Sequence, residues 1–263
     1  MTWLKQSVES GKDVARAVAF LSRIPMPAAL FADDTHKAAA QQAWAFPLAG
    51  LVIGAYGALI ILIFGQFASA LLVAVLAIAG TTIITGALHE DGLADVADGF
   101  WGGWTVERRL DIMKDSTVGA YGVLALVIWF ALAATALSDV ITALGPAPAA
   151  LCWLTLCAAS RAAMTVLWAT TKPARTHGVA HAAGQPANRA AVVSLVATAV
   201  IAMLAIGLGG PLVLLPTLLL VGLKVFFLRL LCLEKIGGHT GDTLGATQKV
   251  AEMVGLVGLA IML

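Results

Sequence analysis

Four acidic side chains closely follow a histidine in a chain that carries few charges of any kind. Asp91, Asp95 and Asp98 are spaced i, i+4 and i+7, so a helix would place their three carboxylates on one face. Like charges on one face repel each other, whereas clustered carboxylate oxygens suit Mg²⁺, which commonly binds substrate phosphates as well. The spacing predicts a metal site with His89 and Glu90 beside it; the plainer alternative is a solvated helix end.

A basic block follows the acids and carries Arg108, Arg109 and Lys114. The planar guanidinium of arginine matches the oxygens of a phosphate group, and lysine supplies a point charge. Carboxylates that hold a metal and cations that hold phosphates are the groups that phosphoryl transfer requires. The block therefore predicts phosphate binding, although the same charges could simply fix the orientation of the chain in a membrane.

A glycine-rich polar segment at 237–246 contains His239, Thr240 and Asp242. Such a loop can present backbone N–H groups to an anion, and Asp242 could add a metal ligand or a general base. No Gly-Lys-Ser/Thr sequence follows, so the segment is not a Walker A loop. The alternative is a flexible turn between two helices.

The composition indicates which elements must position these groups. Of the 263 residues, 60% are hydrophobic and 12% are charged, and the mean hydropathy is +0.93. Soluble domains are about 45–50% apolar and about 25% charged. We therefore expect an all-α, polytopic helical membrane protein that forms a single integral membrane domain over residues 1–263. The net charge of +1 gives no reason to expect a nucleic-acid partner.

Apolar runs long enough to cross a bilayer, which takes about 20 residues, occur about seven times. Residues 3–23 instead mix basic and apolar side chains, which is typical of an amphipathic helix lying on the membrane surface. The last apolar run is short and could be incomplete or tilted. The predicted spans are 45–65, 69–88, 120–138, 148–170, 190–208, 211–232 and 250–263.

The distribution of charge predicts the orientation of these spans. The loops near 66–68, 139–147 and 209–210 contain no Lys or Arg. By the positive-inside rule, the polar segments that carry most of the basic residues are cytoplasmic, which places the N-terminus inside and the C-terminus outside. Two of these segments, 89–119 and 233–249, would form the active site. The four polar segments are 1–43, 89–119, 171–189 and 233–249.

Polar residues in and between the apolar runs have simpler interpretations. Arg161 should face the interior of the bundle, because a charge that faces lipid is costly. The three cysteines have a spacing that suits neither zinc nor disulfides, so we expect small packing residues. His177 and His181 are four residues apart, but Pro173 and Gly178 argue against the helix that a zinc site would need.

Several ordered motifs resemble the cobalamin synthase family, also called the adenosylcobinamide-GDP ribazoletransferase family. The family's acidic element is similar to H-E-D-G-L-A-D-V-A-D-G at 89–99, and its later elements are similar to R-x-L-x-I-M-K-D-S-x-x-G-x-Y-G at 108–122 and G-x-T-G-D-x-x-G-A at 238–246. L-S-R-I-P-M-P and F-P-L-A-G near the N-terminus also look familial. Thr117 departs from the pattern, since arginine is more usual there, which puts a phosphate contact at that position in doubt.

The resemblance implies a Mg²⁺-dependent step late in vitamin B12 assembly. Adenosylcobinamide-GDP would donate its cobinamide-phosphoryl group to α-ribazole or α-ribazole 5′-phosphate, release GMP and form adenosylcobalamin or its 5′-phosphate. The expected place is the bacterial inner membrane, with the active site on the cytoplasmic side and the lipid bilayer as a partner; a homo-oligomer is compatible with the sequence.

Mapped onto the matching motifs, the resemblance implies a role for each candidate residue. The metal ligands would be Asp91, Asp95, Asp98 and Asp242; the phosphate-binding residues would be Arg108, Arg109, His239 and Thr240; and the catalytic residues would be His89, Glu90 and Lys114.

Two other functions share parts of this chemistry. A CDP-alcohol phosphotransferase also uses aspartate-bound metal and a nucleotide leaving group, but its D-G-x-x-A-R element is not met after Asp91 and Gly92. A divalent-cation transporter would place ionisable residues near the bilayer midplane within paired repeats. Here the acids gather at one membrane face and no repeat is visible.

Overall fold

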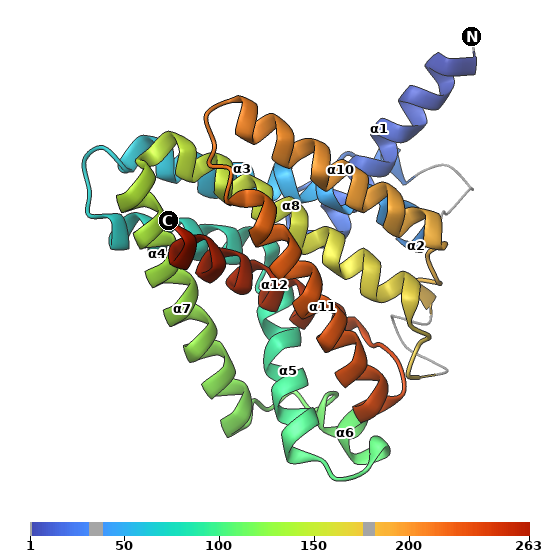
Figure 1. The fold of residues 1–263 in the computed structure, drawn as a ribbon. Coiled ribbons are helices and arrows are strands. Elements are labelled where there is room, and N and C mark those ends of the chain that lie inside the picture. Colours follow the sequence, from blue (N-terminus) through green and yellow to red (C-terminus); the bar gives the residue numbers. More distant parts are fainter. Residues whose placement is uncertain (1, 32–38, 176–181) are drawn as a thin grey trace.

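Long apolar helices make up most of the computed structural model, which describes residues 2–31, 39–175 and 182–263 (Figure 1). Within these ranges the only β pairing is an isolated bridge between Pro173 and His239, so the all-α prediction is confirmed. The elements are α1 (Thr2–Leu21), η1 (Ala28–Leu30), α2 (Ala39–Gln42), η2 (Ala43–Ala45), α3 (Phe46–Phe64), α4 (Ala70–Thr85), α5 (Leu88–Gly102), α6 (Val106–Ile112), α7 (Ala120–Leu144), α8 (Pro146–Thr170), α10 (Asn188–Gly207), α11 (Leu214–Ile236) and α12 (Gly241–Met262).

Six helices are long and apolar enough to cross a membrane, and a bent pair of helices raises the number to as many as seven. The predicted multi-pass helical membrane protein is therefore confirmed. Five predicted spans correspond to α3, α7, α8, α10 and α11, with α7 extending beyond the predicted end to Leu144.

Two predicted boundaries are wrong. The second predicted span, 69–88, ends earlier than expected, because α4 stops at Thr85 and α5 leaves it at an angle of 91°. The last predicted span begins earlier than hydropathy indicates, because α12 already starts at Gly241 and contains 22 residues. The segment predicted as a polar connection over 233–249 is therefore mostly helical, and only residues 237–240 lie between α11 and α12.

The bend between α4 and α5 has a local cause. Gly86 and Ala87 both adopt left-handed backbone conformations, with φ of 63° and 57°, which no α-helix can continue through. The backbone N–H of Arg23 donates to the carbonyl oxygen of Ile84 at 2.7 Å. The segment after α1 thus contacts the end of α4 at the point where α5 turns away.

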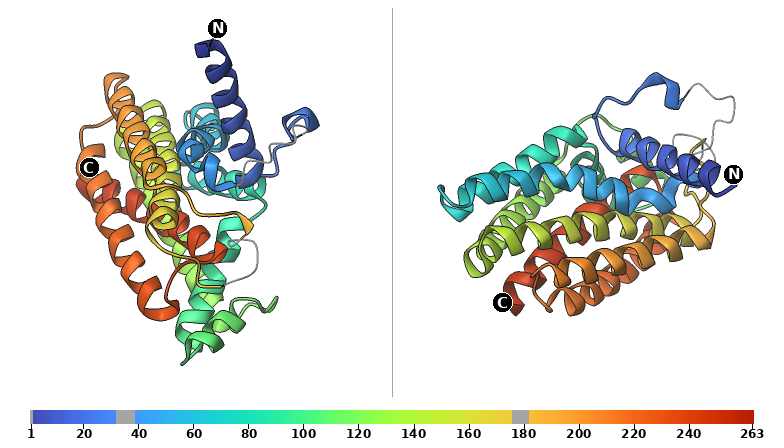
Figure 2. Two further views of the ribbon diagram at one scale, coloured as in Figure 1. Left: turned by 90° about the vertical axis from the view of Figure 1, so that its right-hand side faces the viewer. Right: turned by 90° about the horizontal axis from the view of Figure 1, so that it is seen from above.

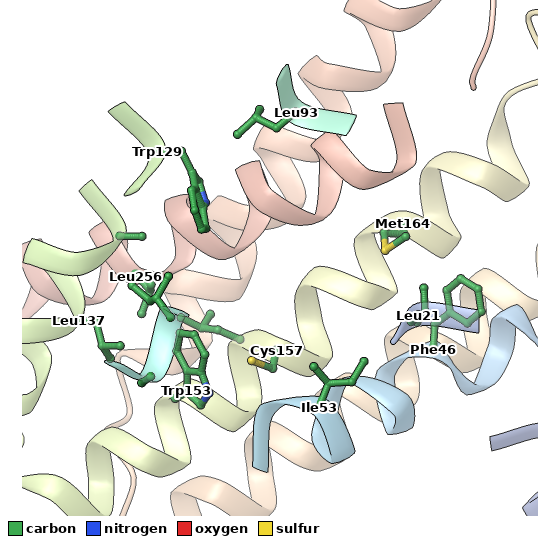
Figure 3. Packing of buried hydrophobic residues seen from close by; sticks show 14 of the residues in the cluster. Leu21, Phe46, Ile53, Leu93, Trp129, Leu137, Trp153, Cys157, Met164 and Leu256 are labelled. Carbon is green, nitrogen blue, oxygen red and sulfur yellow. The ribbon is translucent and has the colours of Figure 1, made fainter. Parts of the chain in front are cut away.

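The core is built around α8, which packs closely against α3. Glycines on α3 allow this approach: a Cβ on Gly54 would lie 2.7 Å from the Cβ of Cys157. The indole N–H of Trp153 donates to the Gly54 carbonyl at 3.0 Å. Figure 3 shows Trp153 and Cys157 between the neighbouring helices. All three cysteines are free and buried, as predicted.

Helix α6 lies beside the end of α11 at one end of the bundle (Figures 1 and 2), where Arg109 donates to the Lys235 carbonyl. At the other end, a Cβ on Gly65 would lie 2.8 Å from Pro146, which brings two uncharged connections together. The helix predicted near the N-terminus is present as α1, and its last turns are packed on the bundle through Ala17, Val18 and Leu21.

Candidate functional site

The acidic helix α5 crosses the first turns of α12 at very short range. A Cβ on Gly92 would lie 2.7 Å from the backbone oxygen of Asp242, and a Cβ on Gly245 would lie 3.2 Å from the Cα of His89. Only residues without a side chain permit this approach. The crossing brings the predicted acidic element and the predicted glycine-rich element into contact, as residues that share one substrate require.

Three carboxylates from these two helices lie within electrostatic range of one another. Asp95 interacts with Asp242 and Asp91, and also with Asp98 on its own helix, and Asp242 interacts with Asp91. Asp91 is exposed, while Asp95 and Asp242 are half-buried, so all three can be reached from outside. We call this group the acidic cluster. Because like charges repel, the cluster is favourable only when a cation or protons offset part of its charge.

The acidic cluster fits a magnesium ion that is shared with a substrate. Among the residues that the structure describes, no three His, Cys, Asp or Glu side chains are grouped closely enough to hold a metal on their own. Mg²⁺, however, usually keeps several waters and binds through one or two carboxylates together with substrate phosphates. The donor chemistry of Asp91, Asp95 and Asp242 matches that mode of binding.

Asp98, the third acid on the predicted face, is engaged elsewhere. Its Oδ2 accepts the backbone N–H of Gly119 at 2.7 Å, and its Oδ1 accepts that of Gly122 at 2.9 Å. These N–H groups lie at the start of α7, where a helix has no internal partners for them. Asp98 therefore ties α5 to the beginning of α7, and its predicted role as a metal ligand stays a prediction.

Arg175 is the residue that sequence reasoning placed least well. It lies in the polar segment 171–189 and belongs to none of the predicted site motifs, yet its guanidinium lies within electrostatic range of Asp95 and Asp242. Its Nη2 donates to the Leu110 carbonyl at 2.6 Å, and its buried Nε has no hydrogen-bond partner in the described part of the chain. An unpaired donor beside carboxylates is suited to a phosphate oxygen.

The basic block divides into a structural arginine and exposed cations. Arg109 donates from Nε to the Gly103 carbonyl at 3.0 Å and from Nη1 to the Lys235 carbonyl at 2.9 Å, so it fastens α6 to the end of α11. Arg108 and Lys114 are exposed. Their predicted roles in phosphate binding and catalysis are compatible with this exposure but stay predictions.

Thr117, in the segment after α6, forms a local turn with Asp115. Its backbone N–H and its hydroxyl both donate to Oδ1 of Asp115, at 3.0 and 2.8 Å. These hydrogen bonds lower the pKa of the exposed Asp115 carboxyl.

The predicted glycine-rich loop is largely the capped N-terminus of α12. The Thr240 hydroxyl oxygen accepts the Thr243 backbone N–H at 3.2 Å, and the hydroxyl donates to Oδ2 of Asp242 at 3.1 Å. The Thr243 hydroxyl in turn accepts the Thr240 backbone N–H at 2.9 Å, which completes a capping box. Thr240 therefore orients Asp242 as well as beginning the helix.

His239 is held immediately before this cap. Its Nδ1 lies 3.0 Å from the Thr171 hydroxyl, which itself donates to the Leu167 carbonyl at 2.6 Å. Because its proton is used in that bond, the Thr171 hydroxyl can only accept a hydrogen bond from Nδ1 of His239. We therefore assign the imidazole proton to Nδ1 and a free lone pair to Nε2. Nε2 is buried without a partner among the described residues, and burial lowers the pKa of His239.

His89 and Glu90 point away from the acidic cluster into the bundle. Oε1 of Glu90 lies 2.9 Å from Nζ of Lys249 and accepts the Thr82 hydroxyl at 2.8 Å. His89 is 1% exposed. Arg161 also faces the interior, as predicted. The predicted catalytic roles of His89 and Glu90 stay predictions, and His177 and His181 lie outside the described residues.

A family model described as cobalamin-5-phosphate synthase matches residues 13–260. The chain belongs to the cobalamin-5-phosphate synthase family. The match begins within α1, ends within α12 and includes every candidate residue named above. The resemblance that the motifs indicated is therefore confirmed.

Curated relatives of this cobalamin-5-phosphate synthase family member agree with the match. The chain is 44% identical over 256 residues to the adenosylcobinamide-GDP ribazoletransferase of Rhizobium etli (strain CIAT 652). It is 42% identical over 255 residues to the protein of the same name from Brucella ovis. Each alignment covers 95% of this chain and 97% of the relative. No solved structure matches the chain.

Proposed function

We propose that this protein joins adenosylcobinamide-GDP to α-ribazole or α-ribazole 5′-phosphate, releasing GMP and forming adenosylcobalamin or its 5′-phosphate. The names of relatives that align along 95% of the chain support the substrates. The observation that carries the proposal is the meeting of α5 and α12, which gathers Asp91, Asp95 and Asp242 at the polar end of a membrane bundle. Such a cluster suits the metal-bound pyrophosphate of a nucleotide-activated substrate.

Asp91, Asp95 and Asp242 are the residues that would hold Mg²⁺. When bound, the ion would offset negative charge on the phosphate oxygens. Thr240 orients Asp242 through its hydroxyl, and Asp98 keeps the end of α5 fixed to α7. Aspartates that are positioned before substrate arrives reduce the reorganisation that binding would otherwise require.

The cations around the cluster would bind the phosphates. Arg175 presents an unpaired Nε beside Asp95 and Asp242, and a guanidinium can bridge a carboxylate and a phosphate. Arg108 and Lys114 are exposed on the neighbouring segment and would add positive charge. These two side chains need not point toward the phosphates before the substrate binds, because exposed side chains can move toward a bound anion.

The reaction requires an acceptor for one proton. In the proposed step the ribose 3′-hydroxyl oxygen bonds to the cobinamide-linked phosphorus, the bond from that phosphorus to GMP breaks, and the hydroxyl proton leaves. His239 is suited to take this proton, because its Nε2 lone pair is free and its neighbour Thr240 contacts Asp242. His89 is less suited, because its side chain is 1% exposed and lies beside Arg161, Lys249 and Glu90 inside the bundle.

The distribution of charge supports an active site on the cytoplasmic side of the bacterial inner membrane. The uncharged connections lie together at one end of the bundle, while the acidic cluster and the basic block lie at the other. Positive charge is retained on the cytoplasmic side in helical membrane proteins.

The experiment that tests this function uses the purified protein in lipid nanodiscs. It is supplied with adenosylcobinamide-GDP and α-ribazole 5′-phosphate, or with α-ribazole, in the presence of Mg²⁺ or of excess chelator. We expect GMP and a cobalamin product in equal amounts, and neither product with chelator. Absence of GMP release under all conditions would overturn the assignment, and release of GMP without dependence on Mg²⁺ would overturn the role of the metal.

A further inference from the structure

A chain of four alternating charges crosses the interior of the bundle behind the acidic helix. Nζ of Lys249 lies 2.9 Å from Oε1 of Glu90 and 3.0 Å from Oε1 of Glu252. Nη1 of Arg161 lies 3.2 Å from Oε2 of Glu252. All four side chains are buried, and their charges cancel. The chain thereby links α5, α12 and α8 without leaving a net charge that would attract an ion.

Several polar atoms in and beside this chain have no partner. Within the described residues, eight buried side-chain nitrogen or oxygen atoms lack a hydrogen bond, and six of them belong to this one region. Native proteins rarely leave such atoms unpaired, because each one loses its hydration without compensation. The six are Nδ1 and Nε2 of His89, Oε2 of Glu90, Nε1 of Trp129, Nε of Arg161 and Oε1 of Gln248.

The six atoms belong to neighbouring side chains. His89 lies within electrostatic range of Arg161, Lys249 and Glu90. Nζ of Lys249 lies 4.5 Å from the centre of the Trp129 ring. Gln248 donates from Nε2 to Oε2 of Glu252 at 2.7 Å, which fixes its amide orientation and leaves Oε1 as the free acceptor. We refer to this region, formed by α5, α7, α8 and α12, as the polar core.

We infer that the polar core is an internal hydration site that holds about two water molecules. A neutral His89 offers one donor and one acceptor, so the six atoms comprise three donors and three acceptors. A cation would satisfy only the acceptors and an anion only the donors, whereas water satisfies both. A buried water typically makes about three hydrogen bonds, so about two waters complete the set.

The hydration site has a consequence for the acidic helix. Glu90 directly precedes Asp91, so the groups that fix Glu90 also fix the position of the acidic cluster on α5. Water that joins Trp129 and His89 to the charge chain would extend this support to α7. The inference itself does not depend on the proposed reaction.

Hydroxyl-radical labelling by X-ray radiolysis tests the inference on the unmodified protein, because bound water next to a buried side chain produces local oxidation. Trp129 is 4% exposed, and Trp153, which is 0% exposed and already bonded to Gly54, is the matched control. Trp104, at 92% exposure, reports the rate in bulk solvent. We expect Trp129 to be oxidised at least fivefold faster than Trp153, and equal rates for the two would overturn the inference.

Rapid mixing with ¹⁸O-water before irradiation separates internal from bulk water. Internal water should delay ¹⁸O incorporation at Trp129 relative to Trp104, whereas simultaneous incorporation would indicate an open channel and would contradict a buried site. A paired variant, Glu90→Met with Lys249→Met, removes two opposite charges together, and we expect oxidation of Trp129 to fall to the rate of Trp153. The measurements on the unmodified protein hold even if this variant does not fold.

Discussion

The carboxylate of Asp98 accepts the backbone N–H of Gly119 at a distance of 2.7 Å, and it accepts a second N–H, from Gly122, at 2.9 Å. This contact uses both carboxylate oxygens of Asp98, which also lies within electrostatic range of Asp95. Asp98 joins two helices, whereas Asp91 and Asp95 are open to a ligand together with Asp242.

Replacement of Asp98 should therefore lower the stability of the fold more than it changes the dependence of activity on Mg²⁺. Asp98→Ala leaves two N–H groups of α7 without a partner, which should destabilise the protein by about 2–4 kcal/mol. Thermal unfolding in detergent measures this loss, and Asp91→Ala, at an exposed position, is the control that should unfold like the parent protein. If Asp98→Ala kept its unfolding temperature, the structural role of Asp98 would be wrong.

Gly92→Ala should disrupt the crossing on which the site depends. The added Cβ would lie 2.7 Å from a backbone oxygen of Asp242, so α5 and α12 must separate. We expect GMP release to fall by at least tenfold. Gly222→Ala is the matched control, because a Cβ at this helical glycine meets nothing within 4 Å, and it should leave activity unchanged and stability equal or slightly greater. Full activity of Gly92→Ala would show that the close crossing is not required.

Arg175→Lys should weaken the binding of the nucleotide substrate. Lysine keeps the charge but loses the forked donors that allow Arg175 to bond Leu110 and a phosphate together. We expect kcat/KM for adenosylcobinamide-GDP to decrease about tenfold, which is about 1.4 kcal/mol of transition-state stabilisation. Steady-state kinetics measure the change, with Arg229→Lys as the control, since Arg229 donates to Thr170 at the end of α8. Equal effects of the two substitutions would contradict the role of Arg175.

His239 should make stability decrease in acid. Burial lowers its pKa from the ordinary value of 6.5, so below that pH the unfolded chain binds more protons than the folded one. The contribution of neutral His239 to the free energy of unfolding is complete above about pH 6.5 and is lost as the pH falls below that value. We expect His239→Asn to narrow the difference in unfolding temperature between pH 7.5 and pH 5.5. If the unfolding temperatures of the parent protein and of His239→Asn changed with pH in parallel, His239 would be equally protonated in the folded and the unfolded state.

The sequence predicted most of the helices because helices depend on local patterns. Apolar runs of 20 residues identify spans, and the spacing of Asp91 and Asp95 places them on one helical face. The start of α12 was missed because its first turns contain Asp242, Gln248 and Lys249, which lower the hydropathy. Gln248 and Lys249 are accommodated by contacts to Ser160 of α8 and Glu90 of α5, which no local pattern reveals.

The different roles of the polar residues also depend on contacts between distant segments of the chain. The distinction between Asp98 and Asp95 follows from the approach of α7, and Arg175 reaches the cluster by bonding a residue 65 positions earlier. Glu90 has the same charge as its neighbour Asp91, but Lys249 draws it into the bundle.

The dependence of turnover on Mg²⁺ concentration in aspartate variants tests the central claim most directly. Asp91→Asn, Asp95→Asn and Asp242→Asn would be compared with Asp111→Asn, which changes an exposed aspartate of α6 outside the cluster. The account predicts that each cluster variant keeps its unfolding temperature but needs at least tenfold more Mg²⁺ for half-maximal GMP release, or loses activity, while Asp111→Asn behaves like the parent protein. Unchanged Mg²⁺ dependence and unchanged rates in all three cluster variants would contradict it.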